Sequence, residues 1–195
     1  MAKGEETRLA ILDEATQVAS RIGLSGLTIG RLAQQTQMSK SGLFAHFKSK
    51  DVLQVEVLSR ARQRFVDTVL APALAAPRGV PRLRALFEAW LRWDAEILDG
   101  GCIFAAASFE LDAQPGSARD ALVQAERDWL DSLATVAGAA VTEGEFRTDV
   151  DCEQFAFELH GLMLAHHHAS RLLGDPHATV RTRRAFEFLL ERSAA

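Results

Sequence analysis

Residues 27–53, with the sequence LTIGRLAQQTQMSKSGLFAHFKSKDVL, constrain the fold of this chain most strongly. Thr28 and Ser39 each precede a short segment with helical spacing, and their hydroxyls suit the N-cap position. The apolar residues that this spacing assigns to the buried faces of the two segments are Ile29, Leu32, Ala33, Leu43 and Phe47. The pattern therefore predicts two short helices joined by a tight turn, followed by a third helix that starts near Ser49.

Every other well-marked segment has helical spacing as well, and no stretch alternates in the manner of a half-buried strand. Helices are predicted over about 5–22, 49–70, 81–98, 102–111, 117–141, 151–173 and 178–192. A linker is expected where prolines and a glycine cluster, at Pro72, Pro77, Gly79 and Pro81. We therefore predict an all-α fold of about nine helices. It has an N-terminal three-helix helix-turn-helix domain over 1–50 and a C-terminal helical bundle over 51–195, and the helix at 51–70 connects the two.

Composition narrows the class of protein further. The chain has 195 residues, of which 48% are hydrophobic, which suffices for the core of one large or two small domains. No apolar run approaches the roughly 20 residues needed to span a bilayer, and the first ten residues have no apolar signal-peptide core. We therefore expect a cytoplasmic protein with no membrane partner. Cys102 and Cys152 do not suggest a disulfide framework, so reduced thiols are expected.

The distribution of charge is more informative than its total. The formal net charge is −4, which by itself argues against a nucleic-acid partner. Residues 1–60, however, carry 8 Lys and Arg against 6 Asp and Glu, a net of +2, while the rest of the chain carries 14 against 20, a net of −6. This asymmetry is consistent with a head that faces phosphates and an acidic body held away from them.

The second short helix has the side chains that a helix needs to enter the major groove of DNA. Small or polar residues stand at its start, and cations follow where phosphates would lie. The residues expected to contact double-stranded DNA are Thr28, Ser39, Lys40, Ser41, Gly42, Phe44, His46 and Lys50. The alternative is a three-helix bundle with a solvated polar face, but the two short helices and their tight turn favour a DNA reader.

Residues 7–60 resemble the DNA-binding domain of the TetR (tetracycline-repressor-like) family of bacterial transcriptional regulators. The matching residues are Ile11, Leu12, Ala15, Ala19, Gly23, Leu27, Thr28, Ile29, Leu32, Ala33, Met38, Ser39, Lys40, Ser41, Leu43, His46, Phe47, Lys50 and Leu53. The resemblance implies an all-helical homodimer with a variable C-terminal ligand-binding domain. It also implies a repressor that binds a palindromic operator and is released by a small, largely apolar molecule.

Carried over by position, the resemblance assigns residues 39–42 to the bases or nearby phosphates. Thr28, His46 and Lys50 are assigned to the DNA backbone. Two residues depart from the family pattern. Gln37 stands where glycine is usual, so it must adopt a less favourable backbone conformation or alter the turn. Phe44 replaces a common tyrosine, which removes a phenolic hydrogen bond but leaves a ring that could touch a thymine methyl group.

The C-terminal half has no comparable motif, and its aromatic residues suggest where a ligand would bind. A pocket in a helical bundle is built from apolar and aromatic side chains with a few polar groups. The residues predicted to line it are Trp90, Trp93, Phe104, Phe109, Trp129, Phe157, His160 and Leu164. Ordinary core packing is the alternative role for each of these aromatic residues.

The helix predicted at 151–173 is apolar on two sides, which indicates that it is buried on two sides. In a small domain, the second face most plausibly packs on another copy of the chain, together with the helix at 178–192. The residues predicted at this dimer interface are Phe155, Leu159, Leu162, His166, Phe186, Leu189 and Leu190.

The alternatives to a ligand-responsive regulator are a regulator of the same fold that is switched by a metal or a thiol and, more remotely, a small helical enzyme. Among His160, His166, His167 and His168 no pair has the i, i+4 spacing that suits a metal, so we expect no metal and no cofactor. The histidines could instead pack or make protonation-sensitive contacts at the dimer interface. Cys102 begins a predicted helix, which allows a thiol switch, although a small buried residue is the commoner role. The remote alternative is a small helical enzyme in which His160 acts as the base and the carboxylates of Glu110 and Asp112 lie near aromatic residues.

Overall fold

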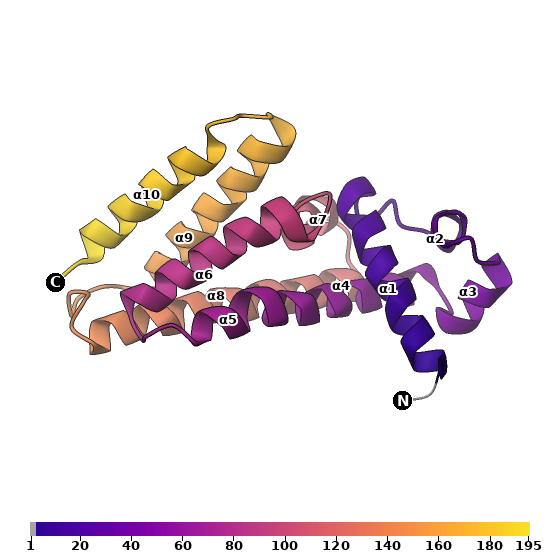
Figure 1. Ribbon diagram of the computed structural model, residues 1–195, viewed down its shortest axis with the longest axis horizontal. Coiled ribbons are helices and arrows are strands. Elements are labelled where there is room, and N and C mark those ends of the chain that lie inside the picture. Colours follow the sequence, from indigo (N-terminus) through magenta and orange to yellow (C-terminus); the bar gives the residue numbers. More distant parts are fainter. Residues whose placement is uncertain (1–2) are drawn as a thin grey trace. The chain divides into compact units, whose positions relative to one another are not determined.

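The computed structural model describes residues 3–195, and helices dominate this range (Figure 1). The α-helices are α1 (Lys3–Ile22), α2 (Ile29–Thr36), α3 (Lys40–His46), α4 (Lys50–Phe65), α5 (Ala71–Leu74), α6 (Val80–Arg92), α7 (Ile103–Leu111), α8 (Ser117–Thr142), α9 (Cys152–His167) and α10 (Ala178–Ser193). Three π-helical segments are η1 (Val66–Leu70), η2 (Trp93–Ile97) and η3 (His168–Leu172). Within residues 3–195 there is no strand, only an isolated bridge between Phe146 and Ala194. The predicted all-α fold is confirmed.

The chain forms two compact units. The head unit comprises the described residues up to Phe65 together with Ala95–Ala125, and the body unit comprises Val66–Asp94 and Glu126–Ala195. The boundary expected at residue 50 is therefore not the boundary of a compact unit. Helix α4 packs on α1 and stays with the head, and the α7 segment joins the head although it is distant in the sequence. Helical periodicity cannot reveal such long-range packing.

The head unit is built around α1 and α4, whose apolar faces pack together. Its fully buried side chains include residues with the predicted helical spacing and two leucines of the turn after α1, namely Ala15, Leu32, Leu43, Phe47, Leu53, Val57 and Ala61 with Leu24 and Leu27. At the edge of this core, Arg60 donates two hydrogen bonds of 2.8 Å to the carboxylate of Asp13. These contacts fix the scaffold that carries α2 and α3.

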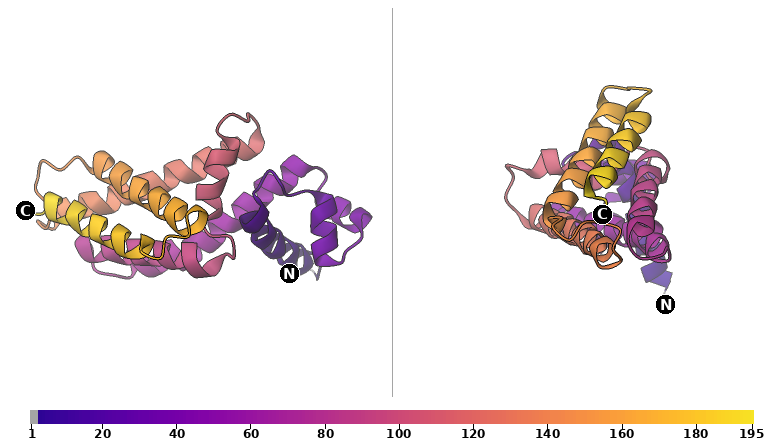
Figure 2. Two further views of the ribbon diagram at one scale, coloured as in Figure 1. Left: turned by 90° about the horizontal axis from the view of Figure 1, so that it is seen from above. Right: turned by 90° about the vertical axis from the view of Figure 1, so that its left-hand side faces the viewer.

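The body unit contains α5, α6, most of α8, α9 and α10. Helices α9 and α10 lie side by side, as all the views show (Figures 1 and 2). Phe87 of α6 stacks on Phe186 of α10 with ring centroids 4.1 Å apart, and Phe146 packs against Phe155 of α9. Most of the aromatic and aliphatic side chains of the body are therefore used for its own core.

The break predicted at the prolines lies between α5 and α6 and is shorter than their pattern suggested. Pro72 stands in the first turn of α5, where a missing backbone N–H costs no helical hydrogen bond. Gly79 has φ +86°, and a Cβ there would lie 1.9 Å from the Glu145 carboxylate, which accepts a hydrogen bond from the backbone N–H of Val80.

No helix among the described residues is long and apolar enough to cross a bilayer.

Candidate nucleic-acid interface

The two short helices begin at the predicted caps. Thr28 has extended backbone angles, and its hydroxyl accepts a hydrogen bond of 3.1 Å from the N–H of Arg31. Ser39 caps α3 in the same way, and its hydroxyl accepts a hydrogen bond of 3.0 Å from the N–H of Gly42. A side-chain cap of this kind stabilises a helix by about 1 kcal/mol and leaves the other first-turn N–H groups free for an anion.

The turn between α2 and α3 depends on Gln37. This residue has φ 55° and ψ 22°, and it is the one non-glycine residue with positive φ among residues 3–195. Left-handed backbone costs a residue with a Cβ roughly 1–2 kcal/mol. Of the two outcomes expected for this departure from glycine, the chain therefore adopts the less favourable conformation and keeps the turn.

Helix α3 is anchored by one side chain and presents the others to solvent. Leu43 is fully buried, while Lys40, Ser41 and Phe44 are exposed. Gly42 lies close to the cap, since a Cβ there would stand 3.1 Å from the Ser39 hydroxyl oxygen. The exposed start of α3 is thus small and polar with one cation, followed one turn later by an exposed aromatic ring.

The residues expected at the phosphates have partners of their own in the free protein. The Nζ of Lys50 donates a hydrogen bond of 2.9 Å to the backbone carbonyl of Ser25. His46 is half-buried, and the centroid of its ring lies 6.1 Å from the ring centroid of Phe47. The Lys50 ammonium group has three N–H donors, so this contact leaves two of them for a phosphate.

The α1–α2 turn, residues 23–25, is also held from the α7 segment, which sequence reasoning missed. The Glu110 carboxylate accepts hydrogen bonds from the N–H groups of Leu24 and Ser25, at 3.2 and 2.8 Å. In the sequence Glu110 stood out only as a remote catalytic candidate. No local pattern marks a contact with a turn some 85 residues earlier.

The residues predicted to line a ligand pocket are divided between the two units. Trp90, Trp93 and Trp129 are buried in the body. His160 and Leu164 of the body are half-buried, and the His160 ring lies 3.1 Å from a Glu126 carboxylate oxygen.

The three phenylalanines predicted with them lie elsewhere. Phe104 belongs to the head, where its ring packs edge-on against Phe65. Phe109 and Phe157 are 70% and 68% exposed within the chain, so neither side chain packs inside the unit that carries it. Of the aromatic residues predicted to line a pocket, the three tryptophans are the ones buried in the body.

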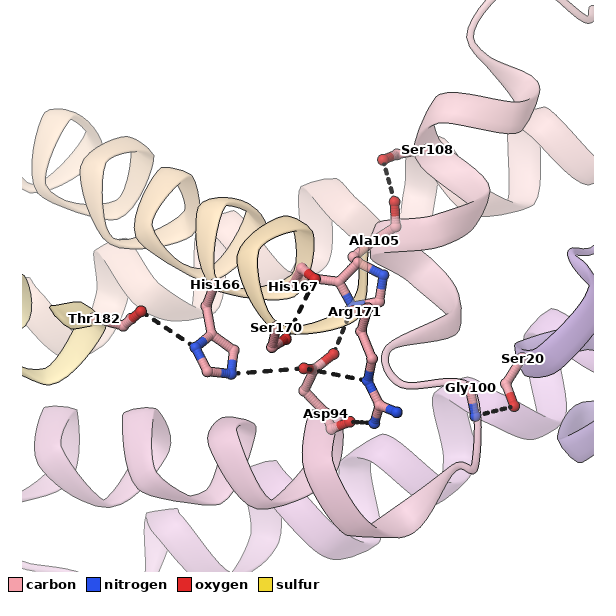
Figure 3. A network of polar contacts seen from close by, with 10 residues as sticks. All are labelled: Ser20, Asp94, Gly100, Ala105, Ser108, His166, His167, Ser170, Arg171 and Thr182. Atoms are coloured by element: carbon pink, nitrogen blue, oxygen red, sulfur yellow. Dashed lines mark hydrogen bonds and ion pairs between the residues drawn. The ribbon is translucent and has the colours of Figure 1, made fainter. Parts of the chain in front are cut away.

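A buried polar network occupies the body unit around Asp94 (Figure 3). The Asp94 side chain is 1% exposed and lies 2.6 Å from Nδ1 of His167 and 3.7 Å from Nε2 of His166. Arg171 donates to the Asp94 backbone carbonyl, and Nδ1 of His166 lies 3.2 Å from the Thr182 hydroxyl. The network joins η2 to α9, η3 and α10.

Burial lowers the pKa of His166 below its ordinary value, and the nearby Asp94 carboxylate offsets part of that effect. His166 was predicted at a dimer interface, but it lies inside the subunit at 4% exposure. Asp94 was not singled out at all, because a single aspartate at the end of an apolar helix carries no signal of its partners.

Most of the side chains predicted at the dimer interface are likewise enclosed by their own subunit. The buried ones are Phe155, Leu159, His166, Phe186, Leu189 and Leu190, whereas Leu162 is half-exposed. The stripe of α9 that contains Phe155 and Leu159 therefore packs inside the subunit, because its neighbours within the chain cover it. A groove of about 370 Å³ instead runs along the outer side of α9 and α10, lined by Glu158, Gly161, Leu162, Ala185, Phe188, Leu189 and Arg192.

The histidines and cysteines form no metal centre in the part of the chain that the structure describes, where no three His, Cys, Asp or Glu side chains are grouped to hold an ion. Cys102 is buried and Cys152 is half-buried. Burial, and then the charge of Asp151, raises the pKa of the Cys152 thiol, which disfavours the reactive thiolate.

Comparison with known proteins decides the family. The model of the N-terminal domain of "Bacterial regulatory proteins, tetR family" matches residues 11–57. The model of the "Tetracyclin repressor-like, C-terminal domain" matches residues 79–186, more than half of the 195 residues. The chain belongs to the TetR family. It is therefore a DNA-binding transcriptional regulator, and the helix-turn-helix described above is its DNA reader.

Relatives agree with this assignment along most of the chain. The HTH-type transcriptional regulator SrpR of Pseudomonas putida is 29% identical over 158 residues, which cover 78% of this chain and 69% of SrpR. A TetR transcriptional regulator from Chloroflexus aurantiacus J-10-FL shares the fold with a TM-score of 0.86 at 22% identity, covering 98% of this chain and 96% of that one.

A further solved structure is that of AibR in complex with isovaleryl coenzyme A and operator DNA. It matches with a TM-score of 0.67 at 24% identity, over 80% of this chain and 84% of AibR. At this identity the match shows a shared fold.

Proposed function

We propose that this TetR-family regulator is a repressor that binds a palindromic operator as a homodimer and is released by a small, largely apolar molecule. The observation that carries the proposal is the exposed, capped start of α3, with Lys40 and Ser41 free of the core and Leu43 anchoring the helix. This is the arrangement that a recognition helix needs in a major groove.

Each exposed residue of the reader has a role that its chemistry suits. Residues 39–42 face base edges or nearby phosphates, and the exposed ring of Phe44 meets a thymine methyl group or a sugar. Thr28, His46 and Lys50 contact the DNA backbone. Lys50 keeps the Ser25 carbonyl as one acceptor and donates to a phosphate with another of its N–H groups.

The body senses the effector. Its support is the set of buried tryptophans, Trp90, Trp93 and Trp129, with the polar pair His160 and Glu126 on α9 and α8. Large rings with donor N–H groups and a few polar atoms suit a small apolar ligand with one polar end. The AibR complex, which contains both an acyl coenzyme A and operator DNA, illustrates that this fold accommodates the two kinds of partner.

Dimerisation uses the outer side of α9 and α10. Phe157 and Phe188 are 68% and 55% exposed there, and a Cβ at Gly161 would meet nothing within 4 Å. Two such helices from each of two copies form a four-helix bundle, and a small residue at the seam allows close approach of the helices. The two heads of the dimer then meet successive major grooves about 34 Å apart.

The other readings have less support. Glu110 instead accepts hydrogen bonds from the backbone of the α1–α2 turn, and His160 pairs with Glu126. A thiol switch is disfavoured by the burial of Cys102 and the raised pKa of Cys152. We therefore propose a regulator without catalytic activity that acts in the bacterial cytoplasm.

Selection of genomic DNA fragments on the purified protein at near-physiological salt tests the proposal. We expect one short palindrome to be enriched, and Lys40→Ala to abolish the enrichment. Arg127→Ala removes an equal charge from an exposed position on α8 and should leave the enrichment intact. Equal enrichment of all fragments, lost as salt rises, would contradict sequence-specific regulation.

A further inference from the structure

Side chains from two other segments form hydrogen bonds with the backbone of the turn between α1 and α2, one with its N–H groups and the other with its carbonyl groups. On the N–H side, the two oxygens of the Glu110 carboxylate accept from Leu24 at 3.2 Å and from Ser25 at 2.8 Å. Gly23, with φ +82°, makes this approach possible, because a Cβ at that position would lie 2.7 Å from a Glu110 oxygen. A hydrogen bond to a charged acceptor is worth more than one between neutral groups.

On the carbonyl side, the same turn is held by α4. Gln54 is buried and donates from Nε2 to the carbonyl of Leu24 at 2.7 Å, and Lys50 donates to the carbonyl of Ser25 at 2.9 Å. Ser25 therefore stands between Glu110, which takes its N–H, and Lys50, which takes its carbonyl. The proposed phosphate contact and the Glu110 carboxylate share one residue of the turn.

Glu110 belongs to a segment that fits closely against the end of α1. Gln17 exchanges hydrogen bonds of 3.1 Å with the carbonyl of Ile97 and the N–H of Asp99. The N–H of Gly100 donates to the Ser20 hydroxyl at 3.1 Å (Figure 3), and a Cβ at Gly100 would lie only 1.8 Å from the Ser20 carbonyl oxygen. The backbone of the segment thus has little freedom to slide along α1.

The same segment is continuous with the body at both of its ends. Residues 95–125 pack with the head, yet they lie within the range 79–186 that matches the family's C-terminal domain. The residue before the segment is Asp94, which the His167 ring holds within the body at 2.6 Å.

We propose that Glu110 is a positioning residue for DNA binding, which holds the α1–α2 turn so that the start of α2 and Lys50 face the DNA backbone together. Glu110 itself touches no DNA. The proposal rests on the proposed function and adds to it a residue, Glu110, that positions the DNA-binding helices.

The test is the affinity of the full-length protein for its selected operator, measured by fluorescence anisotropy for Glu110→Ala and for a matched control. Glu96→Ala removes the same charge from an exposed position on the same segment. We expect Glu110→Ala to weaken operator binding about tenfold, within the range usual for coupling between sites, while Glu96→Ala leaves it unchanged or slightly tighter. Equal affinities of the two variants would overturn the proposal.

A double-substitution cycle separates positioning from a general loss of stability. If Glu110 acts on Lys50 through Ser25, the combined variant Glu110→Ala with Lys50→Ala should lose less affinity than the sum of the two single losses. Fully additive losses would mean that Glu110 does not act on Lys50 through this turn. Glu110→Gln keeps the shape and one acceptor oxygen, so it should recover part of the affinity and serves if the alanine variant does not fold.

Amide hydrogen exchange distinguishes failure of this proposal from failure of the proposed function. Glu110→Ala should speed the exchange of the Leu24 and Ser25 amides, and Glu96→Ala should not. If Glu110→Ala speeds this exchange but the wild-type protein selects no operator, Glu110 does hold the turn and the proposed role in DNA binding is refuted. Unchanged exchange would refute the hold on the turn whatever the protein does to DNA.

Discussion

The reader helices and the body carry their functions in different ways. In α2 and α3 the decisive features are local, because a cap, a turn and three exposed side chains lie within about 20 residues of each other in sequence. In the body the decisive contacts join distant segments, as when Asp94 meets His167 or Phe87 meets Phe186. A reader of DNA must present side chains outward, whereas a sensor must arrange them inward, and inward arrangements depend on the whole fold.

The largest expected effect separates the inner and outer faces of α10. Phe186 is buried against Phe87, so Phe186→Ala should destabilise the body by about 3–5 kcal/mol through the cavity it leaves. Phe188, on the outer side, is 55% exposed, and Phe188→Ala should instead weaken dimerisation with little loss of subunit stability. Urea unfolding and sedimentation of both variants measure the two effects, and equal destabilisation would contradict the assignment of faces.

The next effect tests the buried network of the body. Asp94→Asn removes the charge that faces His166, His167 and Arg171, and we expect a loss of about 3 kcal/mol, the low end for a broken buried pair. Glu88→Gln, which removes one partner of the exposed ion pair with Arg183, should cost less than 1 kcal/mol. If chemical denaturation gave similar losses of stability for both variants, the charge of Asp94 would not stabilise the body more than an exposed ion pair does.

The pH dependence of stability sharpens the same point. Because burial lowers the pKa of His166 in the folded state, the unfolded chain takes up a proton first as the pH falls through about 6.5. Stability contributed at this site is therefore present at neutral pH and declines below about 6.5 until the folded pKa is passed. The titratable and charged groups around it are Asp94, His167 and Arg171. Thermal unfolding from pH 5 to 8 should show this decline in the wild type and a smaller one in His166→Gln.

The smallest effect belongs to the reader and has a matched control of opposite sign. Gln37→Gly relieves a left-handed backbone and should stabilise the head by up to about 1 kcal/mol. Gln35→Gly, within the helical part of α2, should destabilise it by about 1 kcal/mol. Thermal melts of the two variants decide the matter, and a destabilising Gln37→Gly would mean that the glutamine side chain supplies a contact of its own.

The sequence predicted the helices well, because their signals are local. Thr28 and Ser39 cap α2 and α3 as expected, α1 ends at Ile22 and α7 spans Ile103–Leu111, each close to the predicted limit. Pro72 misled the assignment of the linker, since a proline in a first helical turn reads like a break.

What could not be predicted was which distant segments meet. Periodicity shows that α9 has two apolar faces but not which of them a neighbouring helix covers, so Phe155 and Leu159 were assigned to a partner when their own subunit encloses them. The contact of Glu110 with the α1–α2 turn and the pairing of Asp94 with His167 have no local pattern at all. They arise from packing across more than 70 residues of sequence.

Hydroxyl-radical footprinting of the selected operator with the full-length protein tests the central claim most directly. Two reading heads of one dimer predict two protected regions on the same face of the duplex, about one helical turn or 34 Å apart and related by the palindrome. Lys40→Ala should weaken both regions together. A single protected region, or uniform protection along the fragment, would contradict a dimeric reader built on α3.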